Sequence, residues 1–153
     1  MPIVTLPSSS SKIVEGLQLA VAQSYALTAL AHNAHWNIVG SDFFQLHEFF
    51  GKVYDESFDD ADVFAERIRA LDSLVMVDLA EFKKIAGMPE LKAPFTAQQA
   101  VEALIVGNNR VIVDLKGLAK MTGELNDLET QNMVLDKIFA IQKRLWMLRS
   151  FVK

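Results

Sequence analysis

Apolar residues recur at steps of three and four positions along four long stretches of the chain, which is the periodicity of amphipathic helices. The pattern predicts long helices over residues 12–38, 42–70, 97–122 and 126–150. A short helix is predicted over 78–85, inside the connection between the second and third long helices. Four long helices with one crossover connection predict an all-α four-helix bundle.

Capping residues and helix breakers predict where these helices begin and end. Two pairs have the spacing of a capping box: Asp42 with Gln45, and Thr96 with Gln99. Gly123 is predicted to end the third long helix, and Asn126 with Glu129 to start the fourth.

The N-terminal residues have a different composition from the rest of the chain. Pro2, Pro7 and the serines at 8–11 predict an extended segment over 1–11, with one serine as the first N-cap. Residues 12–153 are predicted to form a single domain, since their length is typical of one.

The second long helix carries two stripes of side chains. The first is mostly apolar and is expected to face the helix's own bundle: Leu46, Phe50, Val53, Ser57, Ala61, Phe64 and Ile68. The second mixes aromatic and metal-binding side chains: His47, Gly51, Tyr54, Phe58, Asp62 and Glu66. A second face of this kind needs a second partner, and a twofold copy of the same helix is the simplest one.

Two imidazoles and two carboxylates near this helix are metal-ligand types: His35, His47, Asp62 and Glu66. Asp62 follows His47 by fifteen residues, which at a rise of about 1.5 Å per residue is about 22 Å along one helix. One straight helix cannot bring both groups to one metal ion. If all four bind together, the histidines come from one subunit and the carboxylates from a twofold-related subunit.

At these residues the chain resembles the Dps proteins, or mini-ferritins. The resemblance rests on HW at 35–36, LHEFF at 46–50, DVFAER at 62–67 and LWMLRSF at 145–151, and it extends over nearly the whole chain. It implies a ferritin-like four-helix-bundle subunit, a hollow dodecamer, and oxidation of Fe(II) at sites shared between twofold-related subunits. Hydrogen peroxide is the oxidant that the resemblance favours, with dioxygen as the other candidate.

The chain departs from the family pattern at Gly51, where members usually carry an Asp four residues after the second histidine. We therefore expect two iron positions per interface site, of which the one nearer His35 is weak. His32 is more often an unligated residue in the family. Trp36 is expected to pack, although in the family it lies next to the iron site.

Other acidic residues are candidates for pores or for mineral nucleation. Asp55 and Asp59 would nucleate ferric oxide on a cavity-facing side of their helix, but a solvated helix face is the more common role of such residues. In the family, acidic residues near the start of the last helix line pores through which iron enters. The candidates here are Glu124, Asp127, Glu129 and Asp136, with ordinary surface charge as the alternative.

Composition limits the classes of function. The chain has no cysteine, 19 acidic and 15 basic residues, and a net charge of −4. Residues 1–11 contain no Lys or Arg. We therefore expect no strong binding to nucleic acid. No signal or membrane-spanning segment is expected, and the cytoplasm is the predicted location.

Two classes of function remain. One is an iron-oxidising and iron-storing cage, and the other is a structural or DNA-protecting cage with a degenerate oxidation site. Gly51 favours the second, whereas the acidic composition disfavours its DNA-binding form. A larger ferritin is disfavoured, because the chain contains no Glu-x-x-His pair.

Overall fold

The computed structural model describes residues 8–153, with side chains from residue 11 onward. This part of the chain contains five helices and no strand: α1 (Ser8–Asn37), α2 (Phe43–Ala70), α3 (Leu79–Ala86), α4 (Ala97–Glu124) and α5 (Leu128–Phe151). The all-α fold with a short helix in the crossover is confirmed. The expected extended segment lies outside the described residues except at 8–11, where the prediction was wrong because these residues are helical. The side chains of serines 8–10, three of the four N-cap candidates, are also outside the described part.

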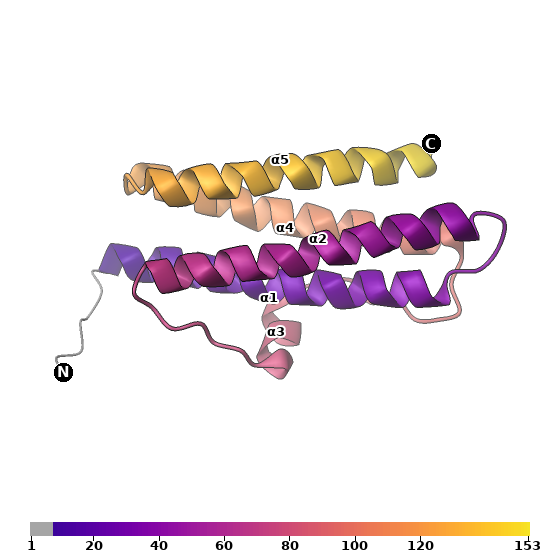
Figure 1. Ribbon diagram of the computed structural model, residues 1–153, viewed down its shortest axis with the longest axis horizontal. Coiled ribbons are helices and arrows are strands. Elements are labelled where there is room, and N and C mark those ends of the chain that lie inside the picture. Colours follow the sequence, from indigo (N-terminus) through magenta and orange to yellow (C-terminus); the bar gives the residue numbers. More distant parts are fainter. Residues whose placement is uncertain (1–7) are drawn as a thin grey trace.

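The helices form two hairpins that pack side by side. α1 and α2 are one antiparallel hairpin, α4 and α5 are the other, and α1 packs against α4 (Figure 1). The crossover between the hairpins carries α3, which packs across α1 on the outside of the bundle. One face of α2 therefore remains uncovered by the four-helix core.

The core is built from the apolar stripes of the four long helices. All seven residues of the predicted core stripe of α2 are buried. The largest fully buried side chains of the described chain come from every helix: Leu17, Ile38, Phe50, Phe64, Ile68, Phe82, Leu104, Leu115, Ile141, Leu145 and Leu148. The sequence pattern thus predicts the inward face of α2 correctly.

Capping at the helix starts differs in part from the expectation. Thr96 and Gln99 form the predicted capping box of α4. Asp42 makes no side-chain capping bond, because its backbone (φ −96°, ψ 12°) is not in the extended conformation of an N-cap. Asn126 adopts a left-handed conformation (φ 58°), so Asp127 is the N-cap of α5. The predicted N-caps Asp42 and Asn126 were therefore wrong, because the backbone at each turn has a different conformation from the one expected.

The turn between α1 and α2 determines where the metal-ligand candidates lie. Gly40 has φ 111°, a backbone conformation that residues with a side chain rarely adopt. This turn reverses the chain within residues 38–42, so the last turn of α1 and the first turns of α2 lie next to each other. His35 and His47 stand on these two neighbouring segments.

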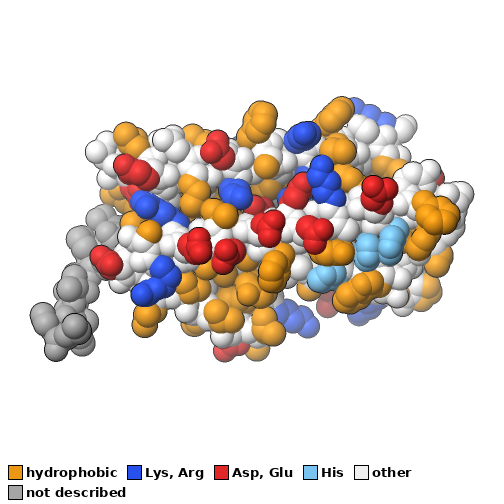
Figure 2. All heavy atoms as spheres, in the orientation of Figure 1, with side chains coloured by type: hydrophobic (Ala, Val, Ile, Leu, Met, Phe, Trp, Pro, Cys, Tyr) orange, Lys and Arg blue, Asp and Glu red, His pale blue; other side chains and the backbone are white. Residues whose placement is uncertain are grey.

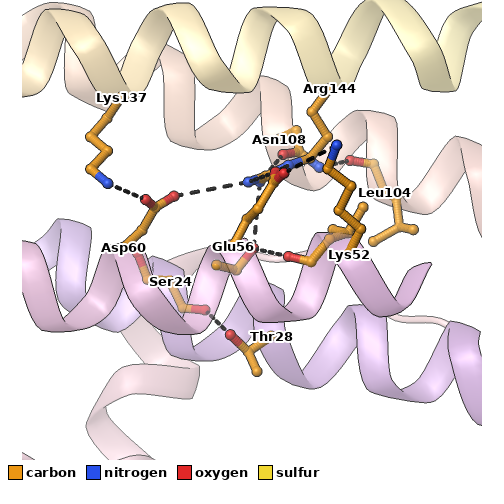
Figure 3. A network of polar contacts seen from close by, with 11 residues as sticks. Ser24, Thr28, Lys52, Glu56, Asp60, Leu104, Asn108, Lys137 and Arg144 are labelled. Carbon is orange, nitrogen blue, oxygen red and sulfur yellow. Dashed lines mark hydrogen bonds and ion pairs between the residues drawn. The ribbon is translucent and has the colours of Figure 1, made fainter. Parts of the chain in front are cut away.

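A buried polar network joins α2 to α5 through the middle of the bundle (Figure 3). Arg144, only 4% exposed, donates to Glu56 over 2.8 and 3.0 Å and to Asn108 over 2.9 Å. Lys137 pairs with Asp60 at 2.7 Å. The sequence pattern did not indicate this network, because its members look like surface charges in an amphipathic repeat.

Residues 11–37 of α1 are long and apolar enough to cross a membrane by length and composition alone. More than half of the most apolar window, 56%, is buried inside the bundle, so the observation is weak evidence for a membrane span. A core helix has the same composition.

Candidate metal centre

His35 and His47 form one closely packed pair. Their ring centroids lie 3.6 Å apart, with the ring planes 19° from parallel. Nδ1 of His35 donates to the backbone carbonyl of His47 over 2.6 Å, and Nδ1 of His47 donates to the carbonyl of His35 over 2.9 Å. The two hydrogen bonds are reciprocal: the end of α1 holds the ring of His47, and the start of α2 holds the ring of His35.

These two hydrogen bonds determine the tautomer of both rings. A carbonyl oxygen only accepts, so both Nδ1 atoms must carry the proton. Both Nε2 atoms then keep their lone pairs, which is the form in which a neutral imidazole binds a metal ion. A backbone carbonyl on the second ring nitrogen is a common support for metal-binding histidines. The pair therefore has the donor chemistry of a metal site.

Gly51 lies directly beside this pair. It is buried, and a Cβ atom added to it would lie 3.5 Å from ring atoms of His35 and 3.8 Å from the ring of Tyr54. Both neighbours belong to the same chain. Within the subunit, these two rings therefore lie at ordinary contact distance from the position that a Cβ atom at residue 51 would occupy.

His32 and Trp36 lie next to the histidine pair. The two rings stack with centroids 4.7 Å apart and planes only 4° from parallel. Trp36 is 68% exposed in the subunit. The His32 ring also contacts Tyr54 at 4.2 Å between centroids. Tyr54 was predicted only as part of the second stripe, and its place between histidines depends on the packing of α1 against α2.

The two candidate carboxylates, Asp62 and Glu66, lie on the same helix as His47 but far from it. Both are exposed. Figure 2 shows histidine side chains at one end of α2 and acidic side chains spaced along the rest of it, on the same face of the subunit. Within residues 11–153, no three His, Asp or Glu side chains come close enough to hold a metal ion together. Within the described residues, the histidine pair and the two carboxylates are therefore separate groups.

The candidate pore and nucleation residues occupy different environments. Asp55, Asp59 and Asp136 are exposed. Glu124 is exposed and pairs with Lys120 at 3.8 Å. None of these four side chains belongs to a buried cluster, so ordinary surface charge is sufficient to explain each of them.

Asp127 has a structural role. It accepts hydrogen bonds from the backbone and hydroxyl of Thr130 over 3.1 and 2.5 Å, and it pairs with Arg67 at 3.1 Å. Burial alone would raise the pKa of Asp127, but the hydrogen bonds from Thr130 and the positive charge of Arg67 lower it below its usual value. The carboxylate is thus ionised and already occupied by partners.

The family model for the ferritin-like domain matches residues 14–153, which is nearly the whole chain. Together with the four-helix bundle and its crossover helix, this match defines a ferritin-like protein.

Comparison with curated relatives narrows the class from ferritin-like proteins to one family. The DNA protection during starvation protein 2 of Bacillus anthracis is 32% identical over 143 residues, which are 94% of this chain and 98% of that protein. General stress protein 20U of Bacillus subtilis is 29% identical over 94% of this chain and 99% of its own length. The chain therefore belongs to the Dps family.

Solved structures of Dps proteins have the same fold. The Bacillus brevis Dps matches with a TM-score of 0.93 and 27% identity, over 97% of this chain and 100% of that one. The Vibrio cholerae Dps matches with a TM-score of 0.91 and 25% identity, over 100% of this chain and 97% of that one. It is described as a member of a broad superfamily of ferritin-like diiron-carboxylate proteins.

Proposed function

We propose that the protein is the subunit of an iron-oxidising and iron-storing cage. Two histidines of one subunit and two carboxylates of a twofold-related subunit bind Fe²⁺ as substrate: His35, His47, Asp62 and Glu66. Hydrogen peroxide, or else dioxygen, takes the electrons from bound Fe²⁺. Ferric oxide then collects inside a hollow homo-oligomer, for which we propose a dodecamer.

The reciprocal hydrogen bonds of the histidine pair carry this proposal. They hold two Nε2 lone pairs ready in a preorganised pair at the end of a helical hairpin. Imidazole suits iron, and carboxylate oxygen ligands complete a site in which both Fe²⁺ and Fe³⁺ can be held. A histidine pair with a purely structural role would not need both rings to keep the same nitrogen, Nε2, unprotonated.

The interior of the bundle disfavours the alternative location of iron within one subunit. Arg144 and Lys137 place two positive charges between α2 and α5, where a larger ferritin would bind metal through Glu-x-x-His pairs. The carboxylates at this place, Glu56 and Asp60, are paired with these cations and so are not free to bind Fe²⁺. Iron binding at the subunit surface is therefore the better account.

Exposed apolar side chains support the presence of a partner subunit. Large apolar side chains of α1, α2, the crossover and α3 are exposed in the subunit: Trp36, Phe58, Leu74, Met76, Val77 and Leu79. Apolar groups in such number usually mark an interaction surface. A second copy of α2, antiparallel across a twofold axis, would cover it and bring its carboxylates toward the histidine pair.

We also propose that each site holds one iron ion tightly, through His47, Asp62 and Glu66, and a second weakly near His35. Gly51 provides no carboxylate for the second ion. Asp55, Asp59, Glu124 and Asp136 remain proposals as nucleation or pore residues, and so does Asp127, whose carboxylate pairs with Arg67 within the subunit.

Subunit mixing tests the shared site. One variant carries His35→Ala with His47→Ala, and the other carries Asp62→Ala with Glu66→Ala. Cages of either variant alone should not oxidise Fe²⁺ above the protein-free rate. In cages assembled at random from equal amounts, each site draws its histidines and its carboxylates from different subunits, so about a quarter of the sites should be complete.

Stopped-flow absorbance of ferric species after addition of Fe²⁺ and peroxide measures this recovery. The matched control is Glu48→Gln, which removes an exposed carboxylate of α2 next to His47 and should leave the rate unchanged. Mixed cages that stay as inactive as their parents would contradict the shared site. Loss of oxidation in the wild type as well would contradict the whole proposal.

A second candidate function is a DNA-protecting cage with a degenerate oxidation site. The names of relatives, such as the DNA protection during starvation protein of Helicobacter pylori, favour it. The net charge of −4 per subunit disfavours direct binding to DNA. A location in the cytoplasm is proposed for either function.

A further inference from the structure

Two adjoining hollows form a groove between α2 and α5, beside the place where Lys52 and Arg144 both meet Glu56 (Figure 3). The first, which we call the cationic hollow, has a volume of about 190 Å³. The second, which we call the apolar hollow, has a volume of about 170 Å³. The side chains of Phe49 and Met147 line both of them, so the two hollows are neighbours along one groove.

Positive charge dominates the cationic hollow. Three cations and one carboxylate line it: Lys52, Lys143, Arg144 and Glu56. The hollow thus has an excess of two positive charges, three against one, whereas the whole chain carries a net charge of −4. A local charge opposite in sign to that of the chain favours an anionic ligand at this place.

Two of the three cations are available to a ligand. Arg144 belongs to the fold, because its guanidinium donates to Glu56 and to Asn108 and its side chain is only 3% exposed. Lys52 lies 3.7 Å from a Glu56 oxygen, and its side chain is 55% exposed. Lys143 is exposed and has no ion-pair partner among the described residues. Lys52 and Lys143 are therefore free to turn toward an anion, while Arg144 adds a fixed positive charge to the wall.

Among the described residues, only apolar side chains line the apolar hollow: Leu46, Phe49, Val101, Met147, Leu148 and Phe151. Leu46, Val101 and Leu148 are buried, whereas Met147 and Phe151 are 36% and 38% exposed. A methionine side chain adapts to the shape of an apolar ligand, because it is unbranched and flexible. An alkyl chain in this hollow would cover apolar surface that the subunit leaves open to water.

From this arrangement we propose that the groove between α2 and α5 binds a small amphipathic anion, a medium-chain carboxylate such as octanoate. The carboxylate lies in the cationic hollow, and the alkyl tail passes Phe49 and Met147 into the apolar hollow. The groove follows α2 from Leu46 to Glu56, ten residues or about 15 Å, which accommodates such a chain in an extended form. The proposal goes beyond iron oxidation and does not depend on it, because none of the four candidate iron ligands lines the groove.

Three probes separate the two halves of the site. Octanoate has both the charge and the tail, octanol has the tail without the charge, and acetate has the charge without the tail. Octanol would fill the apolar hollow but leave the cations without an anion, and acetate would do the reverse. If both hollows contribute, octanoate must bind more tightly than either of the other two.

Equilibrium dialysis of the radiolabelled probes against the assembled, iron-free protein measures the three affinities. We expect octanoate to bind saturably, with one site per subunit, and about tenfold more tightly than octanol or acetate. Added salt should weaken the binding of octanoate, because it screens the lysines, and it should not weaken the binding of octanol.

Matched variants place the binding in this groove. Lys52→Gln and Lys143→Gln should each weaken octanoate binding severalfold and leave octanol binding unchanged, because each removes a charge and keeps a long side chain. Met147→Gln should weaken octanoate and leave acetate unchanged. The control is Lys116→Gln, since Lys116 on α4 is also exposed without an ion-pair partner among the described residues but lies outside the groove. It should bind octanoate as the unmodified protein does.

Circular dichroism and light scattering check that each variant keeps its helices and its assembly. Octanoate binding no tighter than octanol binding would overturn the proposal, because the charge would then contribute nothing. Equal weakening by Lys116→Gln and Lys143→Gln would overturn it as well, since a diffuse attraction to any lysine would explain the binding. The absence of saturable octanoate binding would also overturn it. None of these outcomes affects the proposed function, which is tested by iron oxidation.

Discussion

At the scale of single residues, Gly51 is the position where the site departs most clearly from a full ligand set. A Cβ atom there would be at ordinary contact distance from His35 and Tyr54, so an alanine fits at this position. The native chain supplies no carboxylate beside His35 from this position.

Gly51→Asp should raise iron occupancy near His35 and speed oxidation, because it adds an anionic oxygen ligand beside the weak position. Anomalous scattering from iron-soaked crystals measures both occupancies. Gly51→Ala is the control, and it should stabilise α2 by about 0.5–1 kcal/mol without adding iron. Two equally filled positions in the unmodified protein would contradict the proposed role of Gly51.

Asp127 gives a prediction about pH. Its folded-state pKa is lowered, so its charge stabilises the fold above the unfolded-state pKa of about 4 and this contribution is lost as pH falls through the folded-state value. Asp127→Asn keeps a capping side chain but removes the charge. We expect it to cost about 1 kcal/mol at neutral pH, and less as the solution is acidified.

Thermal unfolding followed by circular dichroism, at fixed protein concentration, tests this. A difference between wild type and Asp127→Asn that stays constant down to strongly acidic pH would mean that the charge of Asp127 does not contribute.

The spacing of His35 and His47 indicated metal ligands, but the sequence did not reveal how their rings are held. Each Nδ1 bonds to a backbone carbonyl of the opposite helix. The direction of a carbonyl at a helix end depends on the turn geometry and leaves no trace in the side-chain pattern. The contact between Tyr54 and His32 was missed for a related reason, since it requires the relative rotation of α1 and α2.

At the scale of helices, hydrophobic periodicity predicted the elements well and their termini less well. The buried stripe of α2 follows from burial of one face, which a period of 3.6 residues encodes directly. The cap of α5 is Asp127 and not Asn126, because Asn126 is used for the left-handed turn that reverses the chain. The left-handed conformation of Asn126 thus moves the N-cap of α5 by one residue.

The polar network between α2 and α5 offers a matched pair of variants. Arg144 and Lys52 both contact Glu56, but the Arg144 side chain is 3% exposed and that of Lys52 is 55% exposed. Arg144→Met should cost about 3 kcal/mol, because it leaves buried polar partners such as Asn108 unpaired. Lys52→Met should change stability by about 0.5 kcal/mol or less, since solvent screens an exposed pair.

Guanidinium unfolding of the two variants at one protein concentration compares them. Equal effects would show that burial does not determine the strength of the contacts to Glu56.

At the scale of the whole molecule, the candidate metal ligands fall into two separate groups within the subunit. On α2, His47 lies fifteen or more residues from the two carboxylates, His35 lies on α1, and within residues 11–153 the four side chains form no common cluster. Sequence spacing anticipated this separation, because helix length follows directly from residue count. It did not reveal which apolar side chains of the crossover would be left exposed, since the segment around α3 has no regular pattern.

The assembled protein should bind duplex DNA weakly or not at all near physiological salt. Each subunit carries a net charge of −4, and residues 1–11 contain no Lys or Arg, so assembly multiplies a charge of the same sign as the phosphates. Fluorescence anisotropy of a labelled duplex at neutral pH and moderate salt measures the binding. The control is the same protein with a lysine-rich N-terminal extension, which should bind in a salt-dependent way. Tight, salt-sensitive binding by the unmodified protein would mean that some surface concentrates positive charge despite the acidic total, and would favour the DNA-protecting function.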